Sequence, residues 1–460
     1  MSNTMKVCKF GGSSVANATQ IQKVIDIIRS DPERRIVVVS APGKRDKDDT
    51  KVTDLLIECA RRGLDGNDTD TAVEAVIGRF RSIQQDMGLP VALLDEIRAD
   101  LVGRVQADME HDGKYTDSIK AAGEDFAARF VAAAFCAQGV PAHYVDLRKA
   151  GMLLSDEFGN ARLLDESYPL LRATFENLDD IAIVPGFFGY TKAGDIATFP
   201  RGGSDITGSI LAAAVHADEY ENFTDVDSVY PVDPRIVPEI DQGIREMTYR
   251  EMRELSYAGF GVFHDEAIHP AVVAEIPIRI KNTNHPEAEG TRVVAHRRVR
   301  HGNVIGVACA EGFCSVHVGK YLMNREIGFG RRLLQIFEDE GVPFDHAPTG
   351  VDNISVIVQE RFFPAEVRER VLERIREELA PEEVSFEPGQ ALMMIVGEGM
   401  RYSIGLASRA IGAVSAANVN VEMINQGSSE ISIMIGIRAS DRKRAIRAMY
   451  KEFFDPKTRV

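Results

Sequence analysis

The first 300 residues alternate short apolar runs with longer stretches whose apolar residues recur every three or four positions. The short runs predict six β-strands, at Met5–Phe10, Arg35–Ser40, Ala142–Asp146, Ile181–Pro185, Glu219–Thr224 and Pro277–Asn282. The longer stretches predict helices, among them Val52–Arg61, Ala121–Ala137 and Asp205–Val215. This alternation is typical of a doubly wound α/β domain with a largely parallel sheet.

The first predicted strand leads into a helix through a glycine-rich turn. The helix begins near Val15, and its apolar residues share one face: Ile21, Val24, Ile25 and Ile28. Two glycines in the turn Lys9–Ser14 let a backbone approach a bulky anion, and a helix N-terminus offers free N–H groups there. Lys9 adds a mobile positive charge. The turn suits a nucleotide phosphate, although taken alone it fits a plain connection between strand and helix equally well.

The end of the second predicted strand carries further polar residues, at a place where α/β proteins bind ligands. The strand ends at Ser40, and a loop of mixed charge then leads to a helix that opens with Lys51–Asp54. Ser40 and Thr53 offer hydroxyl groups to a ligand. Thr53 is almost equally suited to capping the helix.

Two more segments place charged side chains at helix starts. Arg201, in a second glycine-rich turn, can form a bidentate pair with a carboxylate or a phosphate. Ser204 or Asp205 would serve there as a helix cap, but the arginine and two glycines favour a ligand-binding turn. Glu124 sits in the first turn of the helix predicted at Ala121–Ala137. The helix dipole alone explains an acid at that position, and contact with a substrate is the less favoured reading.

Two other parts of the α/β region, the segment before Glu124 and the C-terminal end, carry fewer recognisable motifs. Leu64–Asp117 is charged, has helical periodicity and carries no motif, so we expect an insertion on one edge of the domain. Near Asn284–Thr291 the sequence becomes polar with proline and glycine, and Arg297–Arg300 is basic. This stretch predicts a domain boundary.

The remainder of the chain contains an internal repeat. Ile327–Val358 aligns without a gap on Ile404–Ile435, at an offset of 77 residues. Two copies are too few for a solenoid, and the order of elements fits two ferredoxin-like βαββαβ modules. Such pairs bury a face against each other or against a second chain, which indicates binding and association. A purely structural role in dimerisation is the alternative.

Composition narrows the class of protein. The 460 residues include 54 basic and 70 acidic side chains, a net charge of −16, which argues against nucleic acid as the main partner. No apolar run is long enough to span a membrane, and no secretory signal is visible. Five scattered cysteines form neither a metal-ligand spacing nor a disulfide framework. We therefore expect a cytoplasmic protein with reduced cysteines, in which a local basic site holds any anionic substrate.

Six segments of the α/β region, in this order, resemble the aspartokinase family: KFGGSSV at 9–15, VVVSAPGK at 37–44, AGED at 122–125, RGGSD at 201–205, FTDVDSVYPVDPR at 223–235 and ELSYAG at 254–259. VGEGM at 396–400 and INQGSSE at 424–430 resemble the paired ACT domains of those enzymes. The resemblance implies an amino-acid kinase fold over 1–298 and ACT domains over 303–385 and 386–460. Because the chain stops at Val460, we expect a monofunctional member without a homoserine dehydrogenase half.

The implied activity is phosphorylation of the β-carboxylate of L-aspartate by MgATP, which gives 4-phospho-L-aspartate. This is the first step toward lysine, threonine and methionine. A carboxylate is ionised at neutral pH, so the reaction requires no general base. Mg²⁺ is expected to be carried mainly by the nucleotide phosphates, because the sequence offers no metal-binding cluster of carboxylates.

The resemblance assigns roles to individual residues. Lys9 matches the lysine that contacts the transferring phosphate, and Asp205 an acid that organises this lysine and the helix start. Gly11, Gly12 and Ser13 cradle the phosphate. For the substrate, Arg201 matches the clamp on the α-carboxylate and Glu124 the partner of the ammonium, in a pocket also lined by Ser40, Thr53, Phe187 and Ser204. The nucleotide-binding positions are Thr224, Asp225, Tyr230 and Arg235.

The sequence also departs from the family pattern. Many relatives carry a nucleotide-contacting lysine where this chain has Gly261, and a glycine where it has Pro200. The loop between Ser40 and Thr53 is longer than in many members.

The ACT pair implies feedback inhibition, by lysine in first place and threonine next, in a homodimer or a dimer of dimers. Candidate effector-binding residues are Asp345, Asn425 and Gln426. Turn chemistry explains Asp345 about equally well.

Three other functions are compatible with parts of the sequence. A different amino-acid kinase, such as an acetylglutamate or glutamate kinase, would share the phosphate turns but not Glu124 with an ACT pair. A non-catalytic amino-acid sensor would be expected to lose Lys9 or Arg201, and both are present. A nucleotide-dependent scaffold would bind ATP without transferring phosphate to aspartate.

Overall fold

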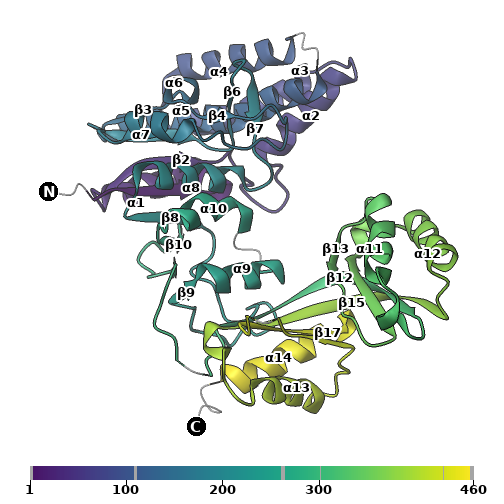
Figure 1. The fold of residues 1–460 in the computed structure, drawn as a ribbon. Coiled ribbons are helices and arrows are strands. Elements are labelled where there is room, and N and C mark those ends of the chain that lie inside the picture. The colour runs from purple at the N-terminus through teal and green to yellow at the C-terminus, as the bar shows by residue number, and fades with distance from the viewer. Residues whose placement is uncertain (1–3, 108–110, 261–264, 301, 428, 456–460) are drawn as a thin grey trace. The chain divides into compact units, whose positions relative to one another are not determined.

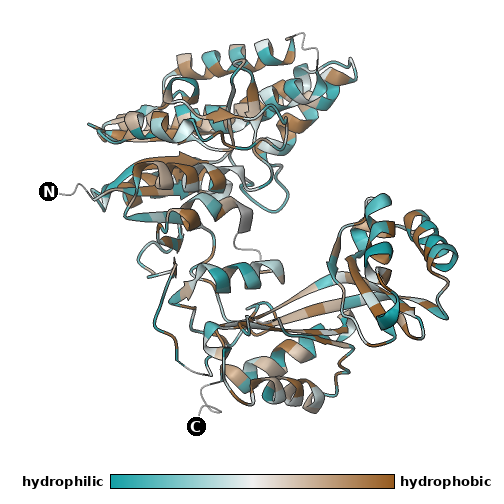
Figure 2. Cartoon of the chain, viewed as in Figure 1, coloured by the Kyte–Doolittle hydropathy of each residue, from teal (hydrophilic) through white to brown (hydrophobic). Residues whose placement is uncertain are grey.

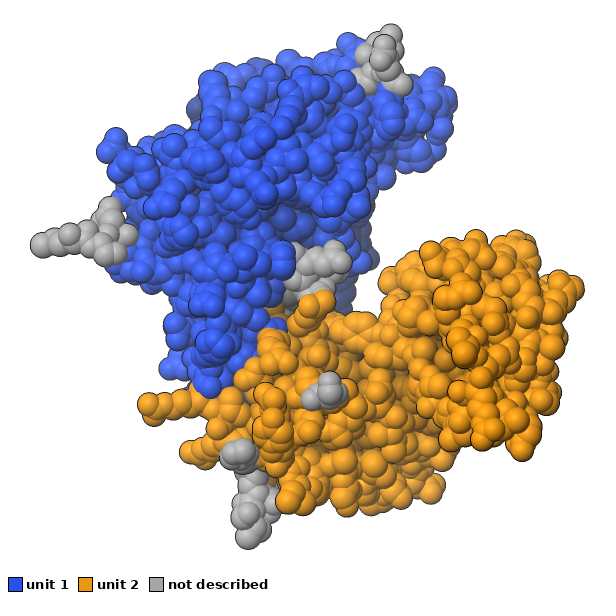
Figure 3. Space-filling model, viewed as in Figure 1, with its two compact units in different colours: residues 1–229, 243–249, 262–297 blue, residues 230–242, 250–261, 298–460 orange. Residues whose placement is uncertain are grey.

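A computed structural model of the chain describes residues 4–107, 111–260, 265–300, 302–427 and 429–455 (Figure 1). Two compact units are present (Figure 3), and each is described by itself. The first consists of Met1–Val229, Gly243–Tyr249 and Val262–Arg297, and the second of Tyr230–Gln242, Arg250–Gly261 and Arg298–Val460. The domain ranges expected from the sequence stay predictions.

The first unit is built on an eight-stranded sheet of order β3-β5-β2-β1-β8-β10-β11-β9. Its strands are β1 (Lys6–Phe10), β2 (Arg34–Val39), β3 (Ala142–Tyr144), β5 (Ile181–Pro185), β8 (Glu219–Thr224), β9 (Glu246–Thr248), β10 (Ile278–Asn282) and β11 (Thr291–Val294). All neighbouring strands are parallel except β10 and β11. The six strands predicted from apolar runs are confirmed.

Helices cover both faces of this sheet, as a doubly wound fold requires. Cys8 and Phe10 of β1 belong to a hydrophobic core with α1 (Ala18–Arg29), α2 (Val52–Leu64) and α5 (Asp112–Ala137). Lys9, which alternates with them, pairs with α8 (Gly203–Val215) instead. The unit also contains α6 (Leu147–Ala150), α7 (Ser167–Phe175), α10 (His269–Val273) and a small sheet of β4 (Leu153–Leu154), β6 (Phe188–Thr191) and β7 (Ile196–Thr198).

The segment expected to be an edge insertion is part of the main core. It forms α3 (Asp70–Met87) and α4 (Val91–Val105), which pack on α2 and α5. Phe80 of α3 is fully buried, with its ring centroid 5.8 Å from that of Phe126 and 5.1 Å from that of Phe130. The predicted helical structure of this segment is confirmed. Its apolar residues, however, pack against other helices of the same domain.

The second unit is built on a six-stranded antiparallel sheet of order β13-β14-β12-β15-β17-β16. The strands are β12 (Gly306–Gly319), β13 (Phe344–His346), β14 (Asn353–Gln359), β15 (Glu383–Val396), β16 (Met423–Asn425) and β17 (Ser432–Arg438). The helices are α9 (Tyr249–Tyr257, which belongs to this unit from Arg250), α11 (Phe329–Asp339), α12 (Ala365–Leu379), α13 (Leu406–Ala416) and α14 (Arg442–Phe453). The order β12-α11-β13-β14-α12-β15 is the predicted βαββαβ pattern.

The internal repeat is confirmed by matching elements. Helix α11 and helix α13 are related by the predicted 77-residue offset, since Phe329 corresponds to Leu406 and Asp339 to Ala416. Val342 and Val419 are both buried, at 4% and 5% exposure.

The two modules share β12 and β15, each 14 residues long. On β12, Val307 and Cys309 pack in the core of α13 and α14, whereas Val316 and Val318 pack in the core of α11 and α12. The buried positions change from odd to even across an irregularity at Gly312, which has φ 87°. In a regular strand the residues facing one side of the sheet are either all odd-numbered or all even-numbered. The irregularity therefore lets one strand contribute side chains to two cores.

Apolar residues concentrate in the sheets and on the inner helix faces (Figure 2). No helix in the described part of the chain has the length and apolar character needed to cross a membrane. The five cysteines are free, and four of them are buried, while Cys136 is exposed.

We predict that Phe80→Ala lowers the free energy of unfolding by about 3–5 kcal/mol, because it removes a buried ring from the core between α3 and α5. Urea unfolding followed by circular dichroism measures the change. Val91→Ala is the control, since Val91 is 62% exposed and its truncation should alter stability by less than about 0.5 kcal/mol. Equal effects of the two substitutions would show that α3 does not belong to the core.

Candidate active site

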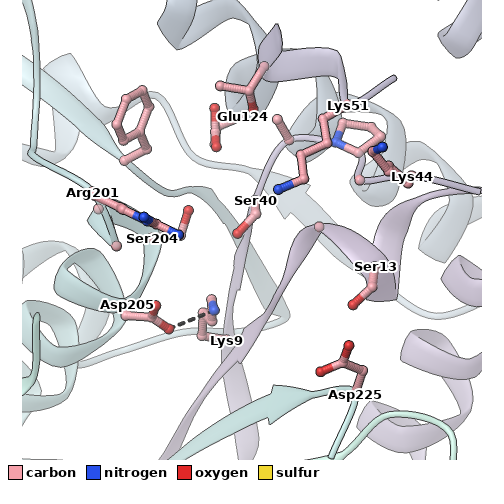
Figure 4. Close-up of a pocket in the computed structure, with 18 residues that line it drawn as sticks. Lys9, Ser13, Ser40, Lys44, Lys51, Glu124, Arg201, Ser204, Asp205 and Asp225 are labelled. Carbon is pink, nitrogen blue, oxygen red and sulfur yellow. Dashed lines mark ion pairs between the residues drawn. The ribbon is translucent and has the colours of Figure 1, made fainter. Parts of the chain in front are cut away.

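A cavity of about 650 Å³ lies at the carboxyl ends of β1 and β2 in the first unit (Figure 4). It gathers most of the site residues that the sequence suggested: Lys9, Gly12, Ser13, Ser40, Thr53, Glu124, Phe187, Arg201, Ser204, Asp205 and Asp225. Since these residues come from distant parts of the chain, the fold brings separate motifs to one site. Their chemical roles stay predictions.

The turn after β1 differs from the predicted strand-to-helix connection. Gly12–Val15 forms a 3₁₀ turn, and α1 begins only at Ala18, where the Asn17 side chain accepts a hydrogen bond from the backbone N–H of Gln20. The α1 N-terminus is thus already capped. Gly12 is required by packing, because a Cβ there would lie 2.8 Å from the Ala41 carbonyl oxygen.

Lys9 is buried and held by an ion pair between strand β1 and helix α8. Its Nζ lies 2.6 Å from Oδ1 of Asp205 in the first turn of α8. The same oxygen accepts a 2.6 Å hydrogen bond from Nδ2 of Asn222 on β8. Asp205 therefore compensates the buried ammonium and fixes its position in the cavity.

Helix α8 begins without a side-chain cap. The alternative interpretation, in which Ser204 or Asp205 serves as a helix cap, is therefore wrong. The N-cap is Gly202 at φ 85°, so neither Ser204 nor Asp205 caps the helix. A Cβ on Gly203 would lie 2.5 Å from the Phe187 ring, which shows how closely the turn packs. The preceding Arg201 is exposed to the cavity and has no ion-pair partner among the described residues.

Phe187 adopts a backbone conformation that is uncommon for a side chain of its size. Its φ is 77°, in the left-handed region. The backbone N–H donates to Oγ1 of Thr207 at 3.0 Å, and its carbonyl accepts from Phe199 at 2.9 Å. These bonds hold the strained residue with its ring against the cavity.

Glu124 lies in the middle of α5, because that helix begins at Asp112 rather than near Ala121. The helix dipole therefore does not explain this acid. Its side chain is 5% exposed, it accepts a hydrogen bond from the Ala41 backbone, and its Oε2 has no partner. Burial raises the pKa of Glu124 to about 7. A buried carboxylate oxygen at a cavity wall suits a cationic group of a ligand.

The loop after β2 contributes two lysines that were not predicted as site residues. Lys44 and Lys51 lie at opposite ends of this loop, and both line the cavity. Lys51 is the N-cap of α2, and no side chain caps that helix, so Thr53 is not a cap. The sequence shows these two lysines close to the end of a strand, which could have indicated a site. Charged residues in loops usually face solvent, however, so their position alone did not predict one.

Some predicted nucleotide positions do not line the cavity. The Thr224 hydroxyl, at the end of β8, donates to Asp225 at 3.2 Å, and Gly11 donates its N–H to the Phe223 carbonyl. Tyr230 and Arg235 belong to the second unit, where Arg235 pairs with Asp233 at 3.0 Å. Gly261 lies outside the described residues.

The candidate effector residues lie at opposite edges of the second unit's sheet. Asp345 is on β13, where Oδ1 accepts hydrogen bonds from the Tyr257 hydroxyl at 2.6 Å and from Gln359 at 3.3 Å. Asn425 ends β16 at the other edge, and Gln426 lines a separate cavity of about 370 Å³. Asp345 therefore does not share a site with Asn425 and Gln426 within this unit.

We predict that Glu124 makes stability fall as pH rises. The folded protein binds this proton more tightly than the unfolded chain, whose glutamates titrate near 4.5. Stability from the buried neutral acid is therefore complete below about pH 4.5 and is lost as pH rises to about 7, by about 3 kcal/mol. Relative to wild type, Glu124→Gln should gain thermal stability between pH 5 and pH 8. Glu96→Gln, on the exposed face of α4, should follow wild type, and parallel curves for all three proteins would contradict the prediction.

Comparisons with known proteins identify the family. The amino acid kinase family matches residues 4–282, and the ACT domain matches 393–453. Aspartokinase 3 of Bacillus subtilis is 51% identical over 450 residues, covering 98% of this chain and 99% of that protein. Chloroplastic aspartokinase 1 of Arabidopsis thaliana is 28% identical over 458 residues, covering 98% and 80%.

Two solved structures share the fold. Aspartate kinase of Clostridium acetobutylicum superposes with a TM-score of 0.85 at 34% identity, covering 98% of this chain and 100% of that one. Escherichia coli aspartokinase III gives 0.77 at 23% identity with the same coverage. These matches confirm the predicted fold class, an amino-acid kinase domain followed by ACT modules. The chain belongs to the aspartokinase family of aspartate kinases.

Proposed function

We propose that the protein transfers the γ-phosphoryl group of MgATP to the β-carboxylate of L-aspartate, giving 4-phospho-L-aspartate and ADP. One observation supports this most strongly. The cavity presents an unpaired carboxylate oxygen of Glu124 and an unpaired guanidinium of Arg201 together with the buried ammonium of Lys9. A free amino acid carries a positive and a negative group close together, and the free Glu124 oxygen and the Arg201 guanidinium complement them.

Aspartate binding follows from these charges. Arg201 holds the α-carboxylate through parallel N–H···O bonds, and the ammonium of the substrate supplies the partner that Glu124 Oε2 lacks. Binding of the ammonium also favours ionisation of Glu124. Ser40, Thr53 and Ser204 add hydroxyl groups, and Phe187 closes one wall.

The chemical step then needs positioning more than proton transfer. The β-carboxylate is ionised at neutral pH, so its oxygen attacks the γ-phosphorus without a base. The bond from that phosphorus to the bridging oxygen breaks, and its electron pair leaves with ADP. Lys9 neutralises the charge that spreads over the phosphoryl oxygens, and Asp205 holds Lys9 in place.

In this proposal the metal ion enters with the nucleotide phosphates. The described residues include no group of three or more histidine, cysteine or acidic side chains able to hold a cation. Asp225 at the cavity wall, next to Ser13, would contact Mg²⁺ that the phosphates carry. When bound, Mg²⁺ neutralises phosphate charge.

The names of similar proteins agree with this proposal. The E. coli enzyme of this fold was solved with aspartate and ADP, and also with lysine and aspartate. A glutamate or acetylglutamate kinase would need space for a longer acceptor. We also propose a place in lysine, threonine and methionine synthesis, a cytoplasmic location, association through the ACT modules, and feedback by lysine before threonine.

We predict that the purified protein forms aspartyl hydroxamate from MgATP, L-aspartate and hydroxylamine. Lys9→Met should lower kcat by about 100-fold or more, because the transferring group loses its buried cation. Lys23→Met removes the same charge from α1, where Lys23 donates to Asn284, and should keep wild-type activity. Absence of hydroxamate above the Lys9→Met background would refute the function.

We predict that lysine inhibits this reaction more strongly than threonine, and that Asp345→Asn weakens inhibition by about tenfold or more. An effector ammonium would compete with the Tyr257 hydroxyl for the Asp345 carboxylate, and an amide binds an ammonium poorly. The concentration for half-inhibition is the measurement. Asp339→Asn, an exposed acid of the same module that pairs with Arg374, should leave it unchanged. Unaltered inhibition in Asp345→Asn would remove this residue from the effector site.

A further inference from the structure

Lys44 and Lys51 line the cavity, but the proposed function assigns them no role. Neither has an ion-pair partner among the described residues, whereas Lys9 is paired with Asp205. In Figure 4, Lys51 extends toward Ser40 in the middle of the cavity. Lys44 lies on the side of the cavity away from Arg201. Both side chains are exposed to solvent as well as lining the cavity, so their ammonium groups are free to bind a ligand with several negative charges that enters it.

A buried arginine from outside the cavity fixes the loop that carries both lysines. Arg79 of α3 is 5% exposed, and its Nη2 donates to the Gly43 carbonyl at 2.6 Å. Its Nη1 donates to the Thr50 carbonyl and lies 3.1 Å from Oδ2 of Asp49. Gly43 and Thr50 directly precede Lys44 and Lys51. One guanidinium therefore holds the backbone at the base of each lysine.

The same loop is attached to the turn that carries the predicted phosphate cradle. The Gly43 N–H donates to the Gly12 carbonyl at 2.8 Å, and a Cβ on Gly43 would lie 2.7 Å from the Gly12 carbonyl carbon. The Val52 N–H donates to the Pro42 carbonyl at 3.1 Å, which closes the base of the loop. The backbone positions from which the two lysine side chains extend are thus fixed relative to Ser13.

We infer that Lys44 and Lys51 form a second cationic pair that binds the terminal phosphates of the nucleotide, and that Arg79 is their positioning residue. This inference rests on the proposed phosphoryl transfer. Lys51 donates N–H bonds to the oxygens of the transferring γ-phosphoryl group. Its positive charge reduces the repulsion between that group and the attacking carboxylate. Lys44 binds the phosphates that stay on ADP. Lys51 keeps its protons throughout, because the reaction moves only the phosphoryl group.

The kinetic test separates the two lysines. Lys51→Met should lower kcat by about 100-fold and change the KM for aspartate by less than about threefold. Lys44→Met should raise the KM for MgATP by about tenfold, with a smaller loss of kcat. Lys47→Met is the matched control, because Lys47 lies in the same loop but does not line the cavity. Equal kcat in Lys51→Met and Lys47→Met, or an effect confined to the KM for aspartate, would overturn the inference.

The role of Arg79 has its own readout. Arg79→Met should lower kcat and raise the KM for MgATP together, with the KM for aspartate unchanged. Arg79→Lys should recover part of both effects, because an ammonium reaches one of the two carbonyls but lacks the guanidinium fork. Melting temperatures are measured in parallel. A loss that tracks stability alone, or that affects both substrates equally, would contradict a positioning role.

A binding measurement separates this inference from the proposed function. Calorimetry compares MgADP with a magnesium-bound ATP analogue that has a non-hydrolysable β,γ-bridge. Wild type and Lys47→Met should prefer the triphosphate analogue, and Lys51→Met should lose about tenfold of that preference. This result does not depend on turnover, so it stands even if no aspartyl hydroxamate forms. An unchanged preference in Lys51→Met would refute the contact with the γ-phosphate.

Discussion

The backbone contact between Gly12 and Gly43 is the constraint on which the catalytic unit depends. The Gly43 N–H reaches the Gly12 carbonyl at 2.8 Å, and neither residue has room for a Cβ. This contact joins the ends of two adjacent parallel strands into one surface. Lys9, Ser13 and Ser40 then face the same cavity, and the loop beyond Gly43 brings Lys44 to it. A side chain at either glycine would separate the two turns.

The distribution of partners divides the cavity's charges into two kinds. The charge of Lys9 is balanced by Asp205, which also accepts from Asn222, so this group is held in place without a ligand while the ammonium keeps further N–H donors for a phosphate. Glu124 Oε2 is buried without a partner, and Arg201 has none among the described residues. Satisfied charges give a rigid frame, and unsatisfied charges are what a ligand completes. The raised pKa of Glu124 follows from the same incompleteness, since burial is opposed by few favourable contacts.

The sequence was sufficient for the central strands, because continuous apolar runs such as Val37–Val39 leave few alternatives to a buried parallel strand. It misplaced the start of α5, because Gly123 and the polar residues before it resemble a helix beginning. In the folded protein Asp117 and Ser118 are buried, so those polar residues belong to the interior. The role of Arg79 was not visible, since its two carbonyl partners lie 36 and 29 residues away and carbonyls have no side-chain signature.

The effector candidates show a different limit. Repeat alignment correctly paired α11 with α13, but it carries no information on the order of strands. The observed order puts Asp345 and Asn425 at opposite edges of one sheet, with β12 and β15 between them. Strand β12 contributes buried side chains to both cores, and β15 contributes buried ones to the core of α13 and α14 and half-buried Val384 and Phe386 to the core of α11 and α12, so neither module has a complete sheet of its own. A shift of β12 or β15 caused at one edge would therefore move residues in both hydrophobic cores, and the shared strands give the two modules a direct mechanical connection.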